Sequence, residues 1–224
     1  MRLLGDIVGR TFLYPETGGA CVGRVLGVSV YAPNTVLVCR ENTTAEMAWD
    51  ATLRNYDGSA VDLAAVAYLN QIAPALRALV PTVTIPIITL TGTTQAKSTL
   101  QRKVFLLTRT EVLGTTESDH FVTNEDEAGM LLPAFLHASW RRSDNNWWLR
   151  SFYYSPGLDH FEPYTAHLPH LTPTYHGIWL RPAFNLPEDL CVSDVANAEG
   201  HYTLLPRGAV DGVYIKRGGV WMKV

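Results

Sequence analysis

The residues of this chain that could carry chemistry gather in residues 152–176, where tyrosines and histidines follow one another closely. Histidine is a common metal ligand and proton carrier, and tyrosine gives a large contact surface with one hydrogen-bonding group. Such a mixture is typical of surfaces that bind other molecules. The candidate ligand-binding residues are Tyr153, Tyr154, His160, Tyr164, His167, His170, Tyr175 and His176.

Metal binding is one chemistry that these histidines could support. His167 and His170 would share an ion only if the loop between them folded suitably, and Pro169 restricts that loop. No Asp, Glu or Cys completes a known ligand spacing around them. Residues 144–146 are the one acidic and amide cluster nearby that suits calcium, and they lie directly before an apolar run. We expect no metal ion and no cofactor, and loop histidines that face solvent or a ligand.

Hydrolytic chemistry needs an activated nucleophile. Ser151, His160 and Asp159 can be combined into a triad on paper, but no serine lies in a nucleophile-elbow pattern. The chain also lacks a phosphate-binding loop and a dinucleotide-binding fingerprint. We therefore expect a protein that is not an enzyme.

Two dense apolar flanks, residues 144–151 and 177–186, border the tyrosine- and histidine-rich stretch. Each large apolar side chain contributes roughly 1.5–3 kcal/mol when buried, so we expect both flanks in the core. A buried arginine needs carboxylate or carbonyl partners, because an unpaired buried charge is costly. We expect the two arginines to tie the flanking strands together, with direct ligand contact as the alternative. The structural anchors are Trp147, Trp148, Arg150, Arg181 and Phe184.

The stretch between the flanks has too much proline and glycine for a long regular element. Its aromatic residues carry polar groups that suit a surface. A rigid frame that supports an adaptable aromatic segment is a common design of binding surfaces. We therefore expect residues 152–176 to be displayed.

The elements that must position this stretch begin with β-rich sequence over residues 1–42. Runs of β-branched and apolar residues, separated by Gly18-Gly19 and Pro33-Asn34, indicate strands over 7–14, 21–31 and 35–39. Residues 43–80 are expected to be helical, with one helix capped by Thr43-Thr44 and a second by Ser59. Pro74 should kink or split the second helix.

The second half of the chain is expected to alternate between short elements. The pattern predicts strands over 83–88, an edge strand because of Pro86, and over 104–108, with a polar loop over 92–98. A short helix is expected within residues 124–137. The last residues predict strands over 202–205 and a hairpin over 213–224 that turns at Arg217-Gly218-Gly219.

Composition limits the class of protein. A chain of 224 residues with 47% hydrophobic residues fits one globular domain with short appendages. A net charge of −3 argues against nucleic-acid binding, which needs a basic face. The three cysteines have no metal-type spacing and are expected to be buried free thiols, with a Cys21–Cys39 bridge as the alternative. We expect no signal peptide and no membrane span, so the protein would be made in the cytoplasm.

The residues Trp-Trp-Leu-Arg-Ser at 147–151, followed by Gly-Ile-Trp-Leu-Arg-Pro-Ala-Phe-Asn-Leu at 177–186, resemble a phage-associated family of domains of unknown function. The resemblance spans roughly residues 20–195. This family is common in tailed-phage virion proteins and similar to the C-type-lectin-like fold of formylglycine-generating enzymes. Those enzymes use a pair of reactive cysteines late in the fold, and this chain has none between Cys39 and Cys191.

The resemblance implies an α+β, C-type-lectin-like domain over residues 1–195. We expect residues 196–224 to be a C-terminal β-hairpin appendage for docking or oligomerisation, with an ordinary hairpin that closes the domain edge as the alternative. The implied function is that of a non-enzymatic bacteriophage virion protein, a tail or fibre component whose aromatic segment binds a host receptor or glycan. The alternatives are a structural decoration or tail-assembly module, and a bacterial binding module. The implied partners are other virion proteins, a host-surface glycan or protein, and further copies of this chain, in the virion.

Overall fold

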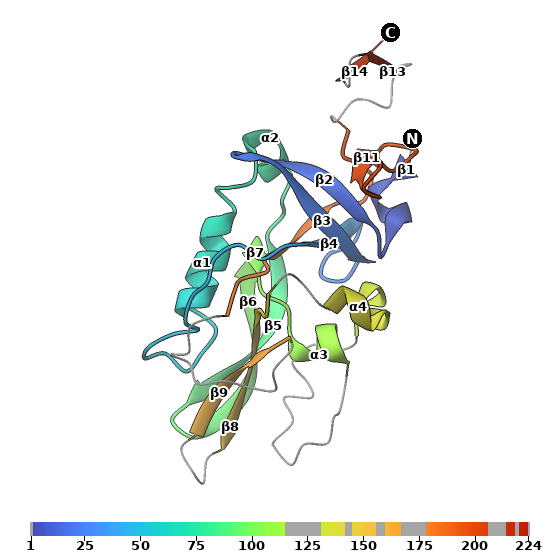
Figure 1. Ribbon diagram of the computed structural model, residues 1–224. Coiled ribbons are helices and arrows are strands. Elements are labelled where there is room, and N and C mark those ends of the chain that lie inside the picture. Colours follow the sequence, from blue (N-terminus) through green and yellow to red (C-terminus); the bar gives the residue numbers. More distant parts are fainter. Residues whose placement is uncertain are drawn as a thin grey trace.

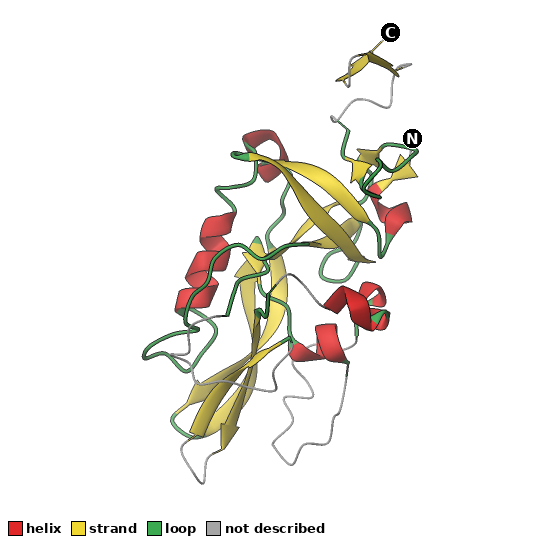
Figure 2. Ribbon diagram, in the orientation of Figure 1, coloured by secondary structure: helices red, strands yellow, loops and turns green. Residues whose placement is uncertain are grey.

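The computed structural model covers residues 1–224 and describes residues 2–114, 131–141, 145–155, 160–166, 178–205, 214–217 and 220–223. The backbone alone is described at residues 138, 153–155, 160–162, 164, 214–217 and 220–223. The fold is mixed α+β, with mostly strands and few helices (Figure 2). The α+β class expected from the sequence is confirmed.

A six-stranded sheet organises the molecule. Its strand order is β12 (Tyr202–Thr203), β2 (Thr11–Glu16), β3 (Gly19–Val28), β4 (Thr35–Arg40), β10 (Ala183–Pro187) and β7 (Val104–Phe105). All pairs are antiparallel except β12 with β2. Strand β10, which ends the second apolar flank, therefore lies inside the sheet, between β4 and the edge strand β7 (Figure 1).

Both faces of the sheet are buried. Along β4, Val36 and Val38 join one apolar cluster, whereas Leu37 and Cys39 join the other. Successive side chains of a strand point to opposite faces, so a strand buried on both sides needs an unbroken apolar run. Helix α1 (Ala60–Tyr68) contributes to both clusters, and α2 (Pro74–Arg77) packs on the cluster that contains Val36.

Two long hairpins extend from the core at the end of the molecule away from α2 and β2 (Figure 1). One is β5 (Val83–Thr91) with β6 (Thr94–Arg102), and the other is β8 (Trp148–Ser155) with β9 (His160–Thr165). Short elements complete the described fold. They are β1 (Arg2–Leu3) paired with β11 (Cys191–Val192), η1 (Leu4–Ile7), α3 (Arg109–Leu113), η2 (Pro133–Leu136), α4 (Ala138–Arg141), and the terminal pair β13 (Tyr214–Arg217) and β14 (Val220–Lys223).

Several expected elements are confirmed. The Ser59 hydroxyl accepts a hydrogen bond from the Asp62 amide at the start of α1, and Pro74 begins a separate helix, α2. Asn34 has a φ of 57°, as a turn at Pro33-Asn34 requires. The terminal hairpin pairs Ile215 with Met222 and Arg217 with Val220. Cys21, Cys39 and Cys191 are free and buried.

Other expectations are wrong. Residues 44–58 form no helix, because Glu46 pairs with Trp179 and Trp49 is fully buried, which fixes the chain in an extended course. Residues 94–98 are not a loop but the start of β6, and the turn is confined to Gly92-Thr93. The strand expected over residues 7–14 begins only at Thr11, as β2, since residues 4–7 form η1. The expected strand over 104–108 is only the two-residue β7, since Thr108 caps α3.

The ends of the expected domain need separate comment. Most of the helix expected within residues 124–137 falls outside the described residues, and residues 133–136 form η2. Strand β12 lies after residue 196, where we expected the appendage to begin, and pairs with β2 of the main sheet. Among the described helices, none has the length and apolar character that crossing a membrane would require.

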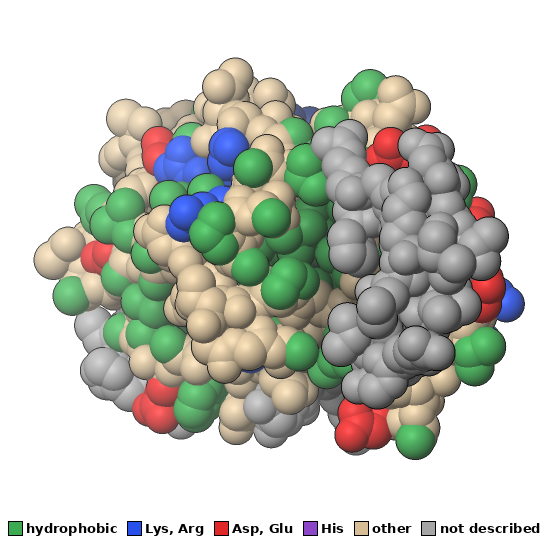
Figure 3. All heavy atoms as spheres, turned by 90° about the horizontal axis from the view of Figure 1, so that it is seen from above, with side chains coloured by type: hydrophobic (Ala, Val, Ile, Leu, Met, Phe, Trp, Pro, Cys, Tyr) green, Lys and Arg blue, Asp and Glu red, His purple; other side chains and the backbone are tan. Residues whose placement is uncertain are grey.

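An apolar groove of about 210 Å³ opens near α2 and the end of β2. Leucines from α2 and from the chain around β11 and β12 line it together with Pro15 and Ala75: Leu76, Leu79, Leu190, Leu204 and Leu205. Seen from above, hydrophobic side chains form a broad band across this end of the molecule (Figure 3).

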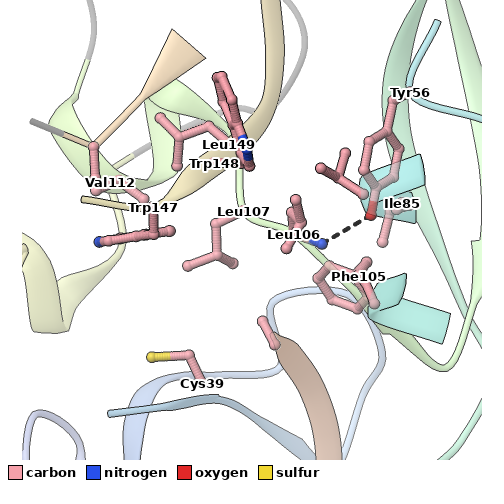
Figure 4. Packing of buried hydrophobic residues seen from close by; sticks show 14 of the residues in the cluster. Cys39, Tyr56, Ile85, Phe105, Leu106, Leu107, Val112, Trp147, Trp148 and Leu149 are labelled. Atoms are coloured by element: carbon pink, nitrogen blue, oxygen red, sulfur yellow. Dashed lines mark hydrogen bonds between the residues drawn. The ribbon is translucent and has the colours of Figure 1, made fainter. Parts of the chain in front are cut away.

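The core on the hairpin side of the sheet is rich in aromatic residues (Figure 4). Trp147, Trp148 and Phe105 are fully buried there. Tyr56 is also fully buried, and its hydroxyl accepts a hydrogen bond of 2.9 Å from the Leu106 amide. Burial raises the pKa of Tyr56, so this hydroxyl stays neutral. The bond fastens the chain after β7 to the segment that leads into α1.

We predict that Tyr56→Phe destabilises the protein by about 1–3 kcal/mol, because the buried Leu106 amide loses its partner. Urea unfolding measures the change. The matched control is Tyr202→Phe, since Tyr202 is partly exposed and water can replace its hydroxyl. Equal stability of the Tyr56→Phe variant and the wild type would contradict this role.

Candidate functional site

The two apolar flanks meet at one junction. Trp147 forms a parallel β-bridge with Trp179. The Trp148 amide donates to the Trp179 carbonyl at 2.9 Å, and the Trp179 amide donates to the Asn146 carbonyl at 3.0 Å. Residues 148 and 179, which lie in the two flanks of the tyrosine- and histidine-rich stretch, therefore lie side by side.

The indole groups fix this junction to the rest of the core. The Trp148 Nε1 donates to the Met47 carbonyl at 2.9 Å, and the Trp147 Nε1 donates to the Arg141 carbonyl at 3.2 Å. Both rings are fully buried. A buried indole N–H without an acceptor is costly, so these bonds specify the orientation of both rings.

The first part of the candidate stretch forms the β8–β9 hairpin, so a longer regular element is present than its proline and glycine content led us to expect. Its register pairs Phe152 with Pro163, Tyr153 with Glu162, Tyr154 with Phe161 and Ser155 with His160. Phe152 and Pro163 are buried and hold the base of the hairpin. Figure 1 shows the hairpin beside β5 and β6, at the end of the molecule away from the main sheet.

The structure brings four of the candidate residues onto this one hairpin. Tyr153 and Tyr154 lie in β8, and His160 and Tyr164 lie in β9. The other candidates, His167, His170, Tyr175 and His176, fall outside the described residues. The segment that contains them joins the end of β9 to the Trp179 side of the junction.

Arg150 fixes the base of the β8–β9 hairpin to the core. Its fully buried guanidinium forms an ion pair with Glu111, with Nη2–Oε1 at 3.2 Å. It also donates to the Leu106 carbonyl at 2.5 Å, the Pro86 carbonyl at 3.2 Å and the Tyr31 hydroxyl at 2.8 Å. The carboxylate and carbonyl partners that we expected are present. Arg150 thus connects β8 with β5, α3 and the chain after β7.

Glu111 has a second role that the sequence signalled. Its carboxylate accepts the Thr108 amide at 2.7 Å while the Thr108 hydroxyl accepts the Glu111 amide at 3.1 Å, which is a capping box at the start of α3. The Thr-x-x-Glu spacing could have identified the cap. It could not have identified Arg150 as the partner, because the two residues are far apart in the sequence.

Arg181 holds the other side of the junction. It is fully buried, donates to the Arg40 carbonyl at 2.8 Å and forms an ion pair with Glu41 at 3.0 Å. Its guanidinium lies 5.1 Å from the Trp147 ring centroid, a cation–π contact. Arg24 shares the Glu41 carboxylate.

The expectation that the two arginines tie the flanking strands to each other is wrong. Arg150 binds β5, α3 and Tyr31, whereas Arg181 binds the end of β4 and its neighbour Glu41. Backbone hydrogen bonds join the flanks, and each arginine fastens one flank to the surrounding core. Sequence reasoning missed Glu41, Arg24 and Tyr31, which carry no local motif.

Of the polar groups considered for catalysis or calcium, Ser151, Asn145 and Asn146 are engaged in this frame, whereas Asp144, Asp159 and the His160 side chain fall outside what the structure describes. The buried Ser151 hydroxyl accepts the Arg109 amide at 2.9 Å. The Asn145 amide donates to Thr43 at 3.2 Å and the Asn146 amide to Thr165 at 3.1 Å. Within the part of the chain that the structure describes, no group of three or more His, Cys, Asp or Glu lies together as metal ligands would.

A second polar network lies in the cluster on the other face of the sheet. The Tyr14 and Tyr68 hydroxyls are 2.5 Å apart, and the Tyr68 hydroxyl donates to Glu16. Glu16 also pairs with Arg40 at 3.1 Å. Burial by itself raises the pKa of Glu16, but hydrogen bonds from Tyr68 and Cys21 and the pairing with Arg40 lower it overall.

Two buried thiols, one in each apolar cluster, are held protonated. Burial raises the pKa of Cys21 to about 11, and it raises the pKa of Cys39 to about 11. The thiolate is the reactive form of cysteine, so both residues are poor nucleophiles at neutral pH. They act as small apolar groups of the core.

We predict that Arg150→Met destabilises the protein by about 3–5 kcal/mol, because it leaves the Glu111 carboxylate buried without its cation. The double variant Arg150→Met/Glu111→Gln should lose less than the sum of the two single changes. Urea unfolding of the three variants gives the coupling. Arg77→Met is the control, since Arg77 bonds to Asn70 on the surface. Additive losses would contradict the pairing.

We predict that Glu16→Gln lowers stability at neutral pH and that this difference disappears in acid. The folded pKa of Glu16 is lower than its ordinary value, so its ionised form stabilises the fold above the unfolded pKa, about 4.3. That contribution is lost as the pH falls through the lowered pKa. Urea unfolding across a pH series measures it, and a difference that grows toward acid pH would contradict the network.

Comparison with known proteins gives one family. No curated protein and no solved structure matches the chain. The family described as a domain of unknown function, DUF6273, matches residues 33–188, which extend from just before β4 to just beyond the Phe184 anchor. The match covers more than half of the chain and includes both apolar flanks, so the chain belongs to the DUF6273 family.

Proposed function

We propose that this protein is a non-enzymatic binding module of a bacteriophage virion, in a tail or fibre, and that residues 152–176 bind a host receptor or glycan. The observation that carries the proposal is the junction of Trp147 with Trp179. A long segment that starts and ends at one buried point can vary in sequence without disturbing the core. This is the arrangement of binding loops on rigid scaffolds.

The hairpin β8–β9 supports the proposal because it gives part of the segment a rigid base. Its two paired strands carry Tyr153, Tyr154, His160 and Tyr164, which lie within a few positions of one another in the strand pairing. Tyrosine loses little conformational entropy on binding and offers both ring surface and a hydroxyl, which suits sugars and protein surfaces alike. Arg150 fixes the base of the hairpin to the core, so the base of the hairpin is already ordered before a ligand binds.

The non-enzymatic part of the proposal rests on the groups that the frame engages. The Ser151 hydroxyl is a buried acceptor, and the Cys21 and Cys39 thiols stay protonated. The virion part rests on the resemblance of the two anchors to domains of tailed-phage virion proteins with a C-type-lectin-like fold. We propose that fold for residues 1–195.

An assembly role is the second candidate. In this role the aromatic segment would pack on a neighbouring virion subunit. The apolar groove beside α2 favours it, because a groove lined by leucines can take an apolar group of another protein. Exposure of residues 152–176 in the assembled particle supports host binding, and burial against another subunit supports assembly.

We predict that the variant Tyr153→Ala/Tyr154→Ala/Tyr164→Ala/Tyr175→Ala loses at least about tenfold in affinity, since aromatic residues contribute most of the energy of such surfaces. The assay is binding of the purified protein to an array of bacterial surface glycans and to whole bacterial cells. Tyr202→Ala is the control, because Tyr202 lies in β12, outside the candidate stretch.

Thermal unfolding of each variant shows whether its frame is intact. Unchanged binding by a folded quadruple variant would overturn the assignment of this surface. Equal loss in the Tyr202→Ala control would show that the effect is not specific to residues 152–176.

A further inference from the structure

The link between an aspartate and a following glycine is chemically labile, and one such pair, Asp57-Gly58, lies in the described residues. The glycine nitrogen attacks the side-chain carbon Cγ of the aspartic acid, because no side chain on the glycine hinders its approach. A C–N bond forms, and the amide proton leaves together with the carboxyl OH as water. Water then opens the succinimide ring at either carbonyl, which returns aspartate or gives isoaspartate.

The turn before α1 places this pair where the reaction is possible. The Asp57 side chain is 55% exposed, so water reaches it. Gly58 has a φ of 78°, a conformation that residues with a side chain rarely adopt. Any other residue at position 58 would strain the turn. The labile pair is therefore a consequence of the geometry that the turn requires.

One ion pair engages both reacting groups. The Gly58 amide donates to Asp62 Oδ2 at 3.0 Å, and Arg102 Nη2 donates to Asp57 Oδ1 at 2.8 Å. Arg102 also binds Asp62 through two hydrogen bonds, Nε–Oδ1 at 3.0 Å and Nη2–Oδ2 at 2.7 Å. The Asp62 side chain is fully buried, so the acceptor of the Gly58 amide has a fixed position.

These contacts oppose the reaction because the attack requires both groups to move. The Gly58 nitrogen has to approach Asp57 Cγ, and its hydrogen bond to Asp62 restrains it. The Asp57 carboxylate has to turn toward Gly58, and its charge-assisted bond to Arg102 holds it toward the end of β6 instead. The reaction therefore needs a local opening of the turn.

We propose that Asp57-Gly58 is a site of isoaspartate formation and that the Arg102–Asp62 ion pair suppresses this modification in the folded protein. Conversion adds one carbon atom to the main chain directly before Ser59, whose hydroxyl caps α1. It therefore displaces the cap and destabilises the start of the helix. This inference does not depend on the proposed role of residues 152–176.

Peptide mapping by mass spectrometry, after long incubation of the full chain at neutral pH, tests the proposal. The folded wild type should form isoaspartate at Asp57 at least about tenfold more slowly than the chain unfolded in urea, since the reaction waits for local opening. The double variant Arg102→Met/Asp62→Ala should convert at nearly the rate of the unfolded chain. It removes both charges together, so no buried carboxylate is left without its cation.

Two further variants separate local release from a general loss of stability. Arg102→Lys keeps the charge beside Asp62 but loses the planar fork that also reaches Asp57, so it should convert faster than the wild type even if the double variant does not fold. Glu16→Gln is the control, because it weakens an ion pair elsewhere and should convert at the wild-type rate. A wild type that converts equally fast folded and unfolded, or a folded Arg102→Lys variant at the wild-type rate, would overturn the proposal.

Discussion

The closure of the chain at Trp147 and Trp179 is the constraint on which the rest of the structure depends. Backbone hydrogen bonds join Trp148 to Trp179 and Trp179 to Asn146, and both indoles next to the closure donate to backbone carbonyls. The second flank then continues into β10, the fifth strand in the order of the main sheet. Because this closure borders β8 as well as the flank that leads into β10, it fixes the base of the β8–β9 hairpin to the main sheet.

Two buried arginines keep this closure in place, and each does so by satisfying polar groups that packing alone would leave unpaired. Arg150 serves two carbonyls, a hydroxyl and the Glu111 carboxylate, and Arg181 serves the Arg40 carbonyl and Glu41. Buried ion pairs add little net stability compared with apolar packing, but losing one partner is costly. We infer that they specify one arrangement of the flanks rather than add much stability.

Sequence patterns located the parts of this fold that local rules control. Ser59, Pro74 and the Pro33-Asn34 turn each act within a few residues, and the unbroken apolar runs marked β4 and the two flanks. The partners of Arg150 and Arg181 could not be found this way, because they come from distant segments. The missing helix at residues 44–58 has the same cause, since the pairing of Glu46 with Trp179 overrides the local helical propensity.

The central claim is that the segment between β9 and the junction is an insert on a self-sufficient frame. The most direct test replaces residues 167–176 by a Gly/Ser linker of the same length and measures urea unfolding. The account predicts a stability within about 1 kcal/mol of the wild type, because the junction is joined by hydrogen bonds of Asn146, Trp148 and Trp179, which lie outside the replaced residues. A protein that loses most of its stability would contradict the account, since the segment would then belong to the core.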